Sequence, residues 1–195
     1  MKFTLEMPLG VVTPPDEFQT MAAVSEMARA LEAAGADAGF VTDHPAPDTK
    51  WLHQGMGHDA LDPFTALAFV AAATTRLKLH TNIVVLPYRN PFLTAKAAST
   101  LQILSDNRLI LGVGVGYMKE EFEALGVDYA ERGALSDEAL ETLRAIWAGG
   151  AVAREGRHFT AVGNEPRPLP SPPPPIWVGG GSDKALERAA RWGDG

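Results

Sequence analysis

The sequence predicts an α/β fold built from parallel βαβ units, and three observations lead to this prediction. Short apolar runs that end in polar residues alternate along the chain with amphipathic segments of helical length. Clusters of glycine, proline, asparagine and aspartate separate these segments and are typical of turns. The chain has 195 residues, of which 46% are hydrophobic, and this is enough for one domain with a substantial core. We therefore expect a single domain over residues 1–195.

The first part of the chain contains two predicted strands with one predicted helix between them. The run FTLEMPL alternates apolar and polar residues from Phe3 to Met7, as a half-buried strand does. Residues 14–35 carry apolar side chains at helical spacings, and Gly35 supplies the stop. The run AGFVTDH, residues 38–44, is a short apolar strand that ends in a polar pair.

The alternation continues after a polar loop at residues 45–61, which is rich in glycine, histidine and proline. Asp62 and Pro63 are typical of an N-cap followed by proline at the first helical position, and they open the helix FTALAFVAAATT. The strand LKLHTNIVVL, the helix PFLTAKAASTLQIL and the strand RLILGVGVG come next. One apolar face of the second helix is expected to carry Leu93, Ala97, Leu101 and Leu104.

The last part of the chain adds one more predicted strand between two helices. The helix SDEALETLRAIWAG precedes the strand PIWVGGG, and the helix SDKALERAARW follows it with Ser182 or Asp183 as its N-cap. The apolar stripe of the first of these helices consists of Leu140, Leu143 and Trp147. Residues 149–175 break the rhythm with a short hairpin across REGRHF and an extended proline-rich run, and we interpret them as an insertion.

Polar residues at several strand ends favour a (β/α)8 barrel of the TIM type over a doubly wound sheet. The active site of such a barrel lies at the carboxyl ends of its strands. About five strands are predicted here, whereas a barrel needs eight strands and typically about 250 residues. We therefore expect a partial barrel of about five βα units, either a shortened relative or a piece of a longer chain.

Composition excludes several classes of function. The chain has 17 Lys and Arg against 24 Asp and Glu, and the net charge of −7 without a basic cluster argues against a nucleic-acid partner. There is no cysteine, so disulfides and thiolate chemistry are excluded. The longest strictly apolar run, ALAFVAAA, is too short to span a membrane, and Glu6 interrupts the N-terminus too early for a signal peptide. We expect a cytoplasmic protein.

Polar residues at two predicted strand ends are candidates for chemistry. Asp43 and His44 directly follow an apolar strand, and histidine titrates near neutrality, which suits proton transfer. A loop pair that caps the next turn explains the same residues equally well. Asn82 lies inside an apolar run and predicts a local irregularity there, with ordinary hydrogen bonding as the alternative. His53 and His58 lie in one loop, but their spacing matches no zinc pattern, so no metal site is predicted.

Two glycine clusters also follow strands. Gly112, Gly114 and Gly116 alternate in GVGVG, but the dinucleotide fingerprint G-x-G-x-x-G needs a glycine where Tyr117 stands. Glycines on one face of a strand leave room for a large flat group, and backbone crowding inside a small barrel is the alternative. The run WVGGGSDKAL places residues 179–181 before a helix, where free N–H groups bind anions, unless the run is only a flexible turn.

Four motifs, taken in order, resemble the bacterial luciferase-like monooxygenase superfamily, and in particular its branch that uses coenzyme F420. These motifs are TDH, TNIVVLPYRNPFLTAKAASTLQILSDNRLILGVGVGYMKEEFEALGV, RG followed by DEALETLRAIW, and PIWVGGGSDKALERAARWGDG. The resemblance implies a (β/α)8 barrel, of which this chain holds the first five units and the start of a sixth. It also implies a flat deazaflavin or flavin ring lying across the carboxyl ends of the strands.

The resemblance further implies roles for individual residues. His44 faces the ring and the substrate as a proton donor or acceptor, and a bulge with a non-proline cis peptide at Thr81-Asn82 supports the ring. The alternating glycines then give clearance for the ring, and residues 179–181 hold a phosphate or polar tail with their N–H groups. The full set of implied cofactor-binding residues is Asp43, Thr81, Asn82, Gly114, Gly116, Tyr117, Gly179, Gly180 and Gly181.

Three functions are compatible with these residues. The first is hydride transfer between coenzyme F420 and an unknown small organic substrate. The second is a monooxygenase that uses reduced FMN and oxygen. The third is a non-catalytic fragment or a barrel relative that dimerises, and relatives are often homodimers. Tyr117 and Asp48 stand where some F420 dehydrogenases carry an acidic residue and a tryptophan, which argues against sugar-phosphate dehydrogenase activity.

Overall fold

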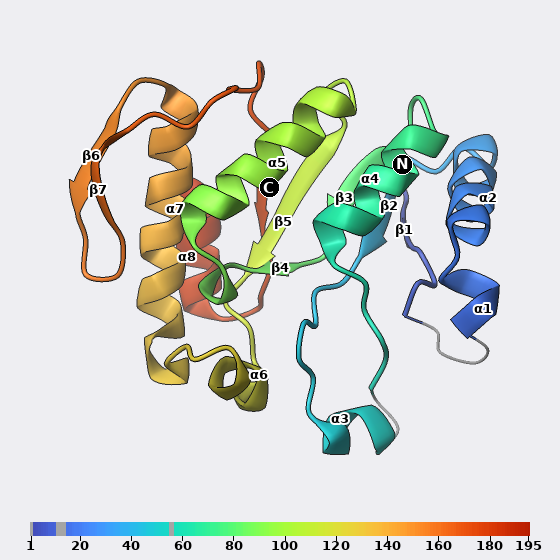
Figure 1. The fold of residues 1–195 in the computed structure, drawn as a ribbon, viewed down its shortest axis with the longest axis horizontal. Coiled ribbons are helices and arrows are strands. Elements are labelled where there is room, and N and C mark those ends of the chain that lie inside the picture. The colour runs from blue at the N-terminus through green and yellow to red at the C-terminus, as the bar shows by residue number, and fades with distance from the viewer. Residues whose placement is uncertain (1, 11–14, 55–56) are drawn as a thin grey trace.

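The computed structural model describes residues 2–10, 15–54 and 57–195, and its centre is a sheet of parallel strands with helices along one face (Figure 1). In spatial order the sheet contains β1 (Thr4–Glu6), β2 (Ala38–Val41), β3 (Lys78–Thr81) and β5 (Leu109–Gly114). β4 (Val84–Val85) continues from β3 along β5, and β8 (Ile176–Val178) pairs with the other edge of β5. Each strand therefore neighbours the next βα unit, as the predicted partial barrel requires.

Helices connect consecutive strands on the outer face of the sheet. The helices that lie between strands are α2 (Met21–Ala33), α4 (Pro63–Ala73), α5 (Pro91–Leu104) and α7 (Arg132–Ala148), and α8 (Asp183–Trp192) follows the last strand. The core lies between these helices and the sheet. For example, Leu67 of α4, Leu79 of β3 and Leu143 of α7 are fully buried in it.

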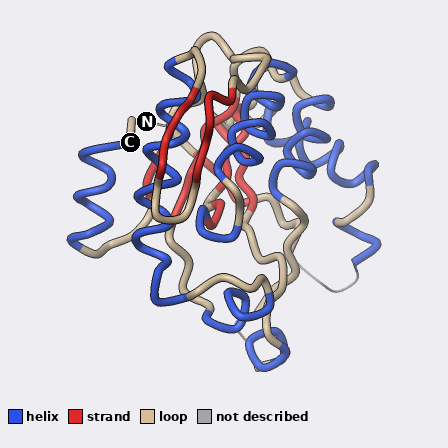
Figure 2. Tube along the Cα trace, turned by 60° about the vertical axis from the view of Figure 1, so that its left-hand side comes forward, coloured by secondary structure: helices blue, strands red, loops and turns tan. Residues whose placement is uncertain are grey.

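Short helices and loops gather beyond the carboxyl ends of the strands, at the lower edge of Figure 1 and below the strands in Figure 2. They include α3 (Thr49–His53), the 3-10 turn η1 (Leu86–Tyr88), α6 (Lys119–Ala124) and the 3-10 turn η2 (Tyr129–Glu131). This end of the sheet is where a barrel carries its active site.

One predicted helix and one predicted loop differ from the structure. The predicted helix 14–35 is interrupted: α1 (Pro15–Phe18) ends before Thr20, whose hydroxyl caps α2 by accepting a hydrogen bond from the Ala23 N–H. Pro14 lies outside the described residues. The predicted loop 45–61 contains α3, whose N-cap Asp48 accepts the backbone N–H groups of residues 50 and 51. Residues 55–56 of that loop also lie outside the described part.

The predicted strand LKLHTNIVVL is divided into β3 and β4. The division falls at a cis peptide bond between Asn82 and Ile83, one residue later than the predicted position at Thr81-Asn82. As a result, the side chain of Ile83 does not follow the alternation of β3. Its position at the carboxyl end of the sheet matters for the site described below.

The predicted apolar face of α5 is only partly correct. Leu101 is buried, but Leu93 and Leu104 are 71% and 76% exposed. The face that meets the sheet consists of smaller side chains, including Ala95 and Ala98, because a tightly packed helix needs small residues at the contact. By contrast, the predicted stripe of α7 is confirmed for Leu140 and Leu143.

The predicted insertion forms an antiparallel hairpin of β6 (Val152–Glu155) and β7 (Thr160–Asn164), followed by an extended run. The carboxylate of Glu138 on α7 accepts the N–H groups of His158 and Phe159 and so fixes the hairpin turn. The proline-rich run packs against the protein through the buried Pro170 and Pro174, as a connector does. No helix within residues 2–10, 15–54 and 57–195 has the length and apolar character needed to cross a membrane.

Candidate functional site

A cavity of about 520 Å³ lies at the carboxyl ends of the central strands, a volume in the range of small-molecule sites. It collects segments from β2, the β3–β4 junction, β5, α6 and the turn after β8. Eight of the ten predicted site residues line it, and Thr81 and Gly181 do not. The lining residues predicted from the sequence are Asp43, His44, Asn82, Gly114, Gly116, Tyr117, Gly179 and Gly180.

One wall of the cavity is built by Ile83, directly after the cis peptide bond. Its side chain packs on the backbone of two glycines from neighbouring strands: a Cβ at Gly114 would lie 2.8 Å from Ile83 Cδ1, and one at Gly179 would lie 3.1 Å from Ile83 Cγ2. Glycine at these two positions therefore lets Ile83 lie close to the sheet. The result is an apolar surface, fit to support a flat ring.

The interpretation of the alternating glycines as direct clearance for a ring needs correction. At Gly112 an added Cβ would lie 1.9 Å from the carbonyl oxygen of Thr81 and 2.8 Å from His80 Nε2. At Gly116, where φ is +76°, it would lie 2.6 Å from Val85. These glycines make room for protein atoms, so backbone crowding, the alternative considered above, explains them. Thr81 itself is fully buried and donates its hydroxyl to the Gly112 carbonyl.

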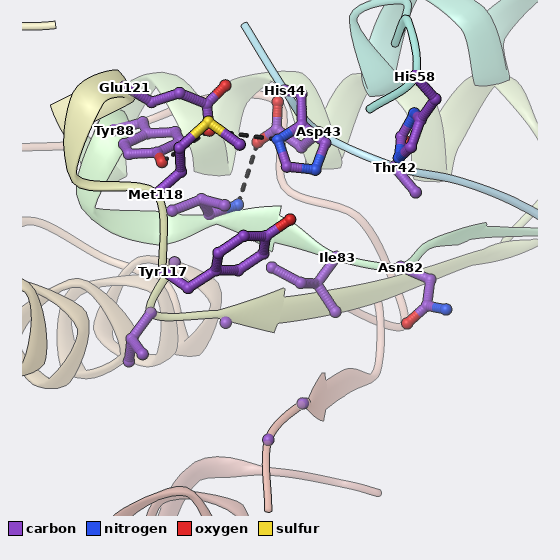
Figure 3. A pocket seen from close by; sticks show the side chains of 16 residues that line it. Thr42, Asp43, His44, His58, Asn82, Ile83, Tyr88, Tyr117, Met118 and Glu121 are labelled. Atoms are coloured by element: carbon purple, nitrogen blue, oxygen red, sulfur yellow. Dashed lines mark hydrogen bonds and ion pairs between the residues drawn. The ribbon is translucent and has the colours of Figure 1, made fainter. Parts of the chain in front are cut away.

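His44 is held at the cavity by a buried carboxylate. Its Nδ1 lies 3.2 Å from Oε2 of Glu121, a side chain on α6 that is only 1% exposed (Figure 3). The Tyr88 hydroxyl donates to the same oxygen at 3.0 Å, and the Ala46 backbone N–H donates to Oε1 at 3.2 Å. Burial, together with the nearby Glu121 charge, raises the pKa of the Tyr88 hydroxyl far above its usual range, so this group stays protonated.

Three aromatic side chains lie beside the His44 ring. Its centroid lies 4.7 Å from the Trp51 ring, 5.2 Å from the His58 ring and 6.0 Å from the Tyr117 ring. Burial, with the Glu121 charge, raises the pKa of the Tyr117 hydroxyl. The imidazole therefore sits among planar aromatic groups, and its hydrogen-bonding neighbour is the carboxylate of Glu121.

Asp43 has both carboxylate oxygens bound to protein groups. Oδ1 accepts from the Arg89 guanidinium at 2.8 Å, and Oδ2 accepts from the Val85 backbone N–H at 3.0 Å. Burial raises the pKa of Asp43, although Arg89 acts in the opposite direction. Arg89 also reaches Asp62, the N-cap of α4, at 3.3 Å. Asp43 thus joins β2 to β4 and α4 and fixes the strand end from which His44 projects.

The glycine turn after β8 leads into α8, whose N-cap is Ser182. The N–H of Gly179 donates to the Val113 carbonyl at 2.8 Å and is committed to the sheet. Of the three predicted anion-binding N–H groups, this one is therefore occupied. Gly180 lines the cavity, whereas Gly181 lies outside the lining.

The sequence prediction missed several residues of the site. Glu121 and Tyr88 were not singled out because their contacts join distant parts of the sequence and depend on how the units pack. Glu121 lies 77 positions from His44, and Tyr88 lies 33 positions from Glu121. Ile83 was hidden by the cis bond, and His58 was noted only as a loop residue. Glu121 did carry one signal, since it follows the glycine strand in a charged helical stretch. Within the described residues, no group of three or more His, Asp or Glu side chains is arranged to hold a metal ion.

A sequence model of the luciferase-like monooxygenases matches residues 3–195. The chain belongs to the luciferase-like monooxygenase family. This chain is similar to the F420-dependent glucose-6-phosphate dehydrogenase of Nocardia farcinica. The two are 32% identical over 197 residues, which cover 97% of this chain and 56% of the dehydrogenase. The resemblance inferred from the motifs is thereby confirmed.

Solved structures of luciferase-like proteins have the same fold as this family member. The monooxygenase RslO1 from Streptomyces bottropensis is 27% identical with a TM-score of 0.80, over 98% of this chain and 57% of RslO1. An F420-dependent secondary alcohol dehydrogenase, solved with an F420–acetone adduct, is 24% identical with a TM-score of 0.82, over 100% of this chain and 57% of that enzyme. The chain therefore spans a little over half the length of these proteins, and the partial TIM-barrel fold is confirmed.

Proposed function

We propose that this protein is an oxidoreductase that transfers a hydride between coenzyme F420 and a small organic substrate. The observation that carries the proposal is the placement of His44 at the rim of a cavity with an apolar wall, at the carboxyl ends of the strands. The 32% identity to an F420-dependent dehydrogenase across 97% of the chain supports F420 as the cofactor.

The residues present fit a flat tricyclic ring. Ile83 and the slim backbone at Gly114 offer an apolar surface for one face of the ring, and Tyr117, which is 64% exposed, stands at the rim. Gly180 lies at the N-terminus of the ten-residue helix α8, where backbone N–H groups and the helix dipole favour an anionic tail. We assign the ring to the first group of residues and the tail to the second.

His44 performs the proton transfer that accompanies hydride transfer. When bound, the deazaflavin supplies a ring carbon that accepts or donates a hydride. Because Nδ1 of His44 faces Glu121, Nε2 is the ring nitrogen available to exchange a proton with substrate. In the oxidative direction His44 takes the substrate hydroxyl proton as the hydride leaves, and in the reductive direction it returns that proton to the substrate oxygen.

Titration of the 195-residue protein with F420 and with FMN, followed by cofactor fluorescence, tests the proposal. We expect F420 to bind, and to bind more tightly than FMN. An Ile83→Glu variant should lose binding because it places a charge on the ring surface, whereas Val162→Glu, at an 89% exposed position on β7, should bind like the parent protein. Binding of neither cofactor would overturn the proposal and favour a non-catalytic barrel relative.

A monooxygenase that uses reduced FMN and oxygen is the second candidate function. The 27% identity to the monooxygenase RslO1, together with the family match, supports it. Tight FMN binding without F420 binding in the same titration would favour this candidate over the first. The substrate is a small molecule in both cases.

We also propose that the protein acts as a cytoplasmic homodimer. Large apolar side chains are exposed on the outer helices, with Phe69 at 47%, Leu93 at 71% and Leu104 at 76%, and a groove of about 500 Å³ lies between α4 and α5. Exposed apolar patches of this kind mark interaction surfaces. Sedimentation should give twice the chain mass, and Leu104→Glu should shift it toward the monomer. A monomeric parent protein at micromolar concentration would contradict the homodimer.

A further inference from the structure

Glu121 is the least exposed charged group at the site, and every interaction of its carboxylate is with a donor or a histidine. The side chain is 1% exposed, and it contacts His44 Nδ1, the Tyr88 hydroxyl and the Ala46 backbone N–H. A buried carboxylate is costly unless hydrogen bonds satisfy its oxygens. Here three groups from two separate segments satisfy them: His44 and Ala46 lie in the loop after β2, and Tyr88 lies on η1.

The identity of these partners determines which nitrogen of His44 carries the proton. The Ala46 N–H can only donate, and it occupies Oε1. An ionised carboxylate has no proton to donate, so the nitrogen that hydrogen-bonds to Oε2 must itself carry one. Nδ1 of His44 is that nitrogen. The neutral imidazole then has its lone pair on Nε2, the ring nitrogen remote from Glu121.

We propose that Glu121 is the positioning residue that holds His44 in the Nδ1–H form and so makes Nε2 the proton acceptor of the site. The proposal rests on the proposed function only in that His44 handles the substrate proton. Glu121 acts through His44 and does not touch the reacting atoms. Tyr88 supports the carboxylate from η1, because its hydroxyl donates to the same oxygen that His44 contacts.

The other titratable groups around His44 do not offer Nδ1 a competing partner. His58 directs its own Nδ1 to the Asp59 carbonyl at 2.8 Å, and it meets the His44 ring edge to face. Tyr117 stands 6.0 Å from the His44 ring, measured between centroids. The carboxylate of the preceding residue, Asp43, is bound to Arg89. Glu121 is therefore the group that decides the proton's position.

Replacing Glu121 by glutamine keeps the shape but changes the donors. The amide oxygen is needed by the Ala46 N–H, which leaves the amide NH₂ facing Tyr88 and His44. The tyrosine hydroxyl can rotate to accept, and His44 can accept at Nδ1 only when its proton moves to Nε2. Glu121→Gln is therefore expected to convert His44 from the Nδ1–H form to the Nε2–H form.

Two-bond ¹H–¹⁵N correlation spectra of histidine-labelled protein test this inference, with each of the five histidines assigned by substitution. At a pH where the imidazole is neutral, Nδ1 of His44 should give the signature of a protonated nitrogen in the parent protein, and Nε2 should give it in Glu121→Gln. Glu120→Gln, at the neighbouring exposed position, and Tyr88→Phe should both leave the parent pattern unchanged. A merely structural role for Glu121 would not move the proton between the two nitrogens.

The parent spectrum tests the proposal even where the variant does not fold. An Nε2–H form of His44 in the parent protein would overturn it, as would an unchanged pattern in folded Glu121→Gln. No cofactor is needed for the measurement. An Nδ1–H form in a protein that binds neither F420 nor FMN would therefore leave the assignment of Glu121 standing and remove the proposed function. In the F420-loaded enzyme, Glu121→Gln should lower kcat by about 10²- to 10⁴-fold, the range typical of general acid–base catalysis.

Discussion

Replacing Gly112 by alanine tests whether the alternating glycines serve packing of the protein itself. The new Cβ would lie 1.9 Å from the Thr81 carbonyl oxygen and 2.8 Å from His80 Nε2. The first of these atoms belongs to the backbone of the neighbouring strand, so the clash cannot be relieved by turning a side chain. β3 and β5 must separate, and the hydrogen bond from the Thr81 hydroxyl to the Gly112 carbonyl is strained as they do.

The expected cost follows from these two effects. Overpacking a well-packed core costs about 1–3 kcal/mol, and a lost buried hydrogen bond costs about 1 kcal/mol. The free energy of unfolding of the variant should therefore be about 2–4 kcal/mol lower than that of the parent protein, which lowers Tm by roughly 4–16 °C for a chain of this length.

Guanidinium unfolding followed by circular dichroism measures this loss. Gly181→Ala is the matched control, because a Cβ at Gly181 has no atom within 4 Å. It should unfold within about 0.5 kcal/mol of the parent protein. Equal stability of the two variants would refute the packing explanation of Gly112.

Three further predictions concern the carboxylates that tie the units together. Burial raises the pKa of Glu32, but hydrogen bonds from the backbone N–H groups of residues 75–77 outweigh it and hold the pKa at about 2 against the usual 4.5. The resulting stability is present above pH 4.5 and is lost as the pH falls toward 2. Glu32→Gln should therefore lower the free energy of unfolding by on the order of 1 kcal/mol at pH 7, where solvent screens the group, and by almost nothing at pH 2. Equal losses in urea melts at both pH values would count against this. Arg89→Met leaves the buried Asp43 carboxylate without its cation and should cost about 3 kcal/mol, part of which the double variant with Asp43→Asn should restore; additive losses would show that the pair is not coupled. Glu138→Ala should speed amide hydrogen exchange in the turn of the β6–β7 hairpin about tenfold, since a hydrogen bond to a charged group contributes about 1.5 kcal/mol, and unchanged exchange rates would mean that Glu138 does not anchor the hairpin.

The sequence predicted the βα alternation well because each unit carries its own local signals. Asp62 and Pro63 begin α4, and Ser182 caps α8, as their residue types indicated. The interruption near Thr20 was missed because the apolar spacing on both sides continues in a helical pattern. The break is marked by Thr20, whose hydroxyl caps the start of α2, and the neighbouring residues gave no glycine or proline to mark it.

The site was predicted only where its residues follow strands directly. His44 and Gly114 could be placed because the carboxyl ends of parallel strands meet at one edge. Glu121, Tyr88 and Ile83 could not, because their positions depend on the orientation of α6, the 3-10 turn and a cis peptide bond. The glycines were visible in the sequence, but what they make room for is decided by neighbouring strands.

The isoleucine methyl groups offer the most direct test of ring binding beside His44. The chain has five isoleucines; Ile83 lines the cavity, and Ile103 lies on the exposed side of α5, outside it. In ¹³C-methyl-labelled protein, added F420 should shift the Ile83 δ1 methyl through the ring current and give nuclear Overhauser effects to the deazaflavin ring protons, while Ile103 stays unchanged. Shifts at Ile103 with an unchanged Ile83 would place the ring elsewhere and contradict the account.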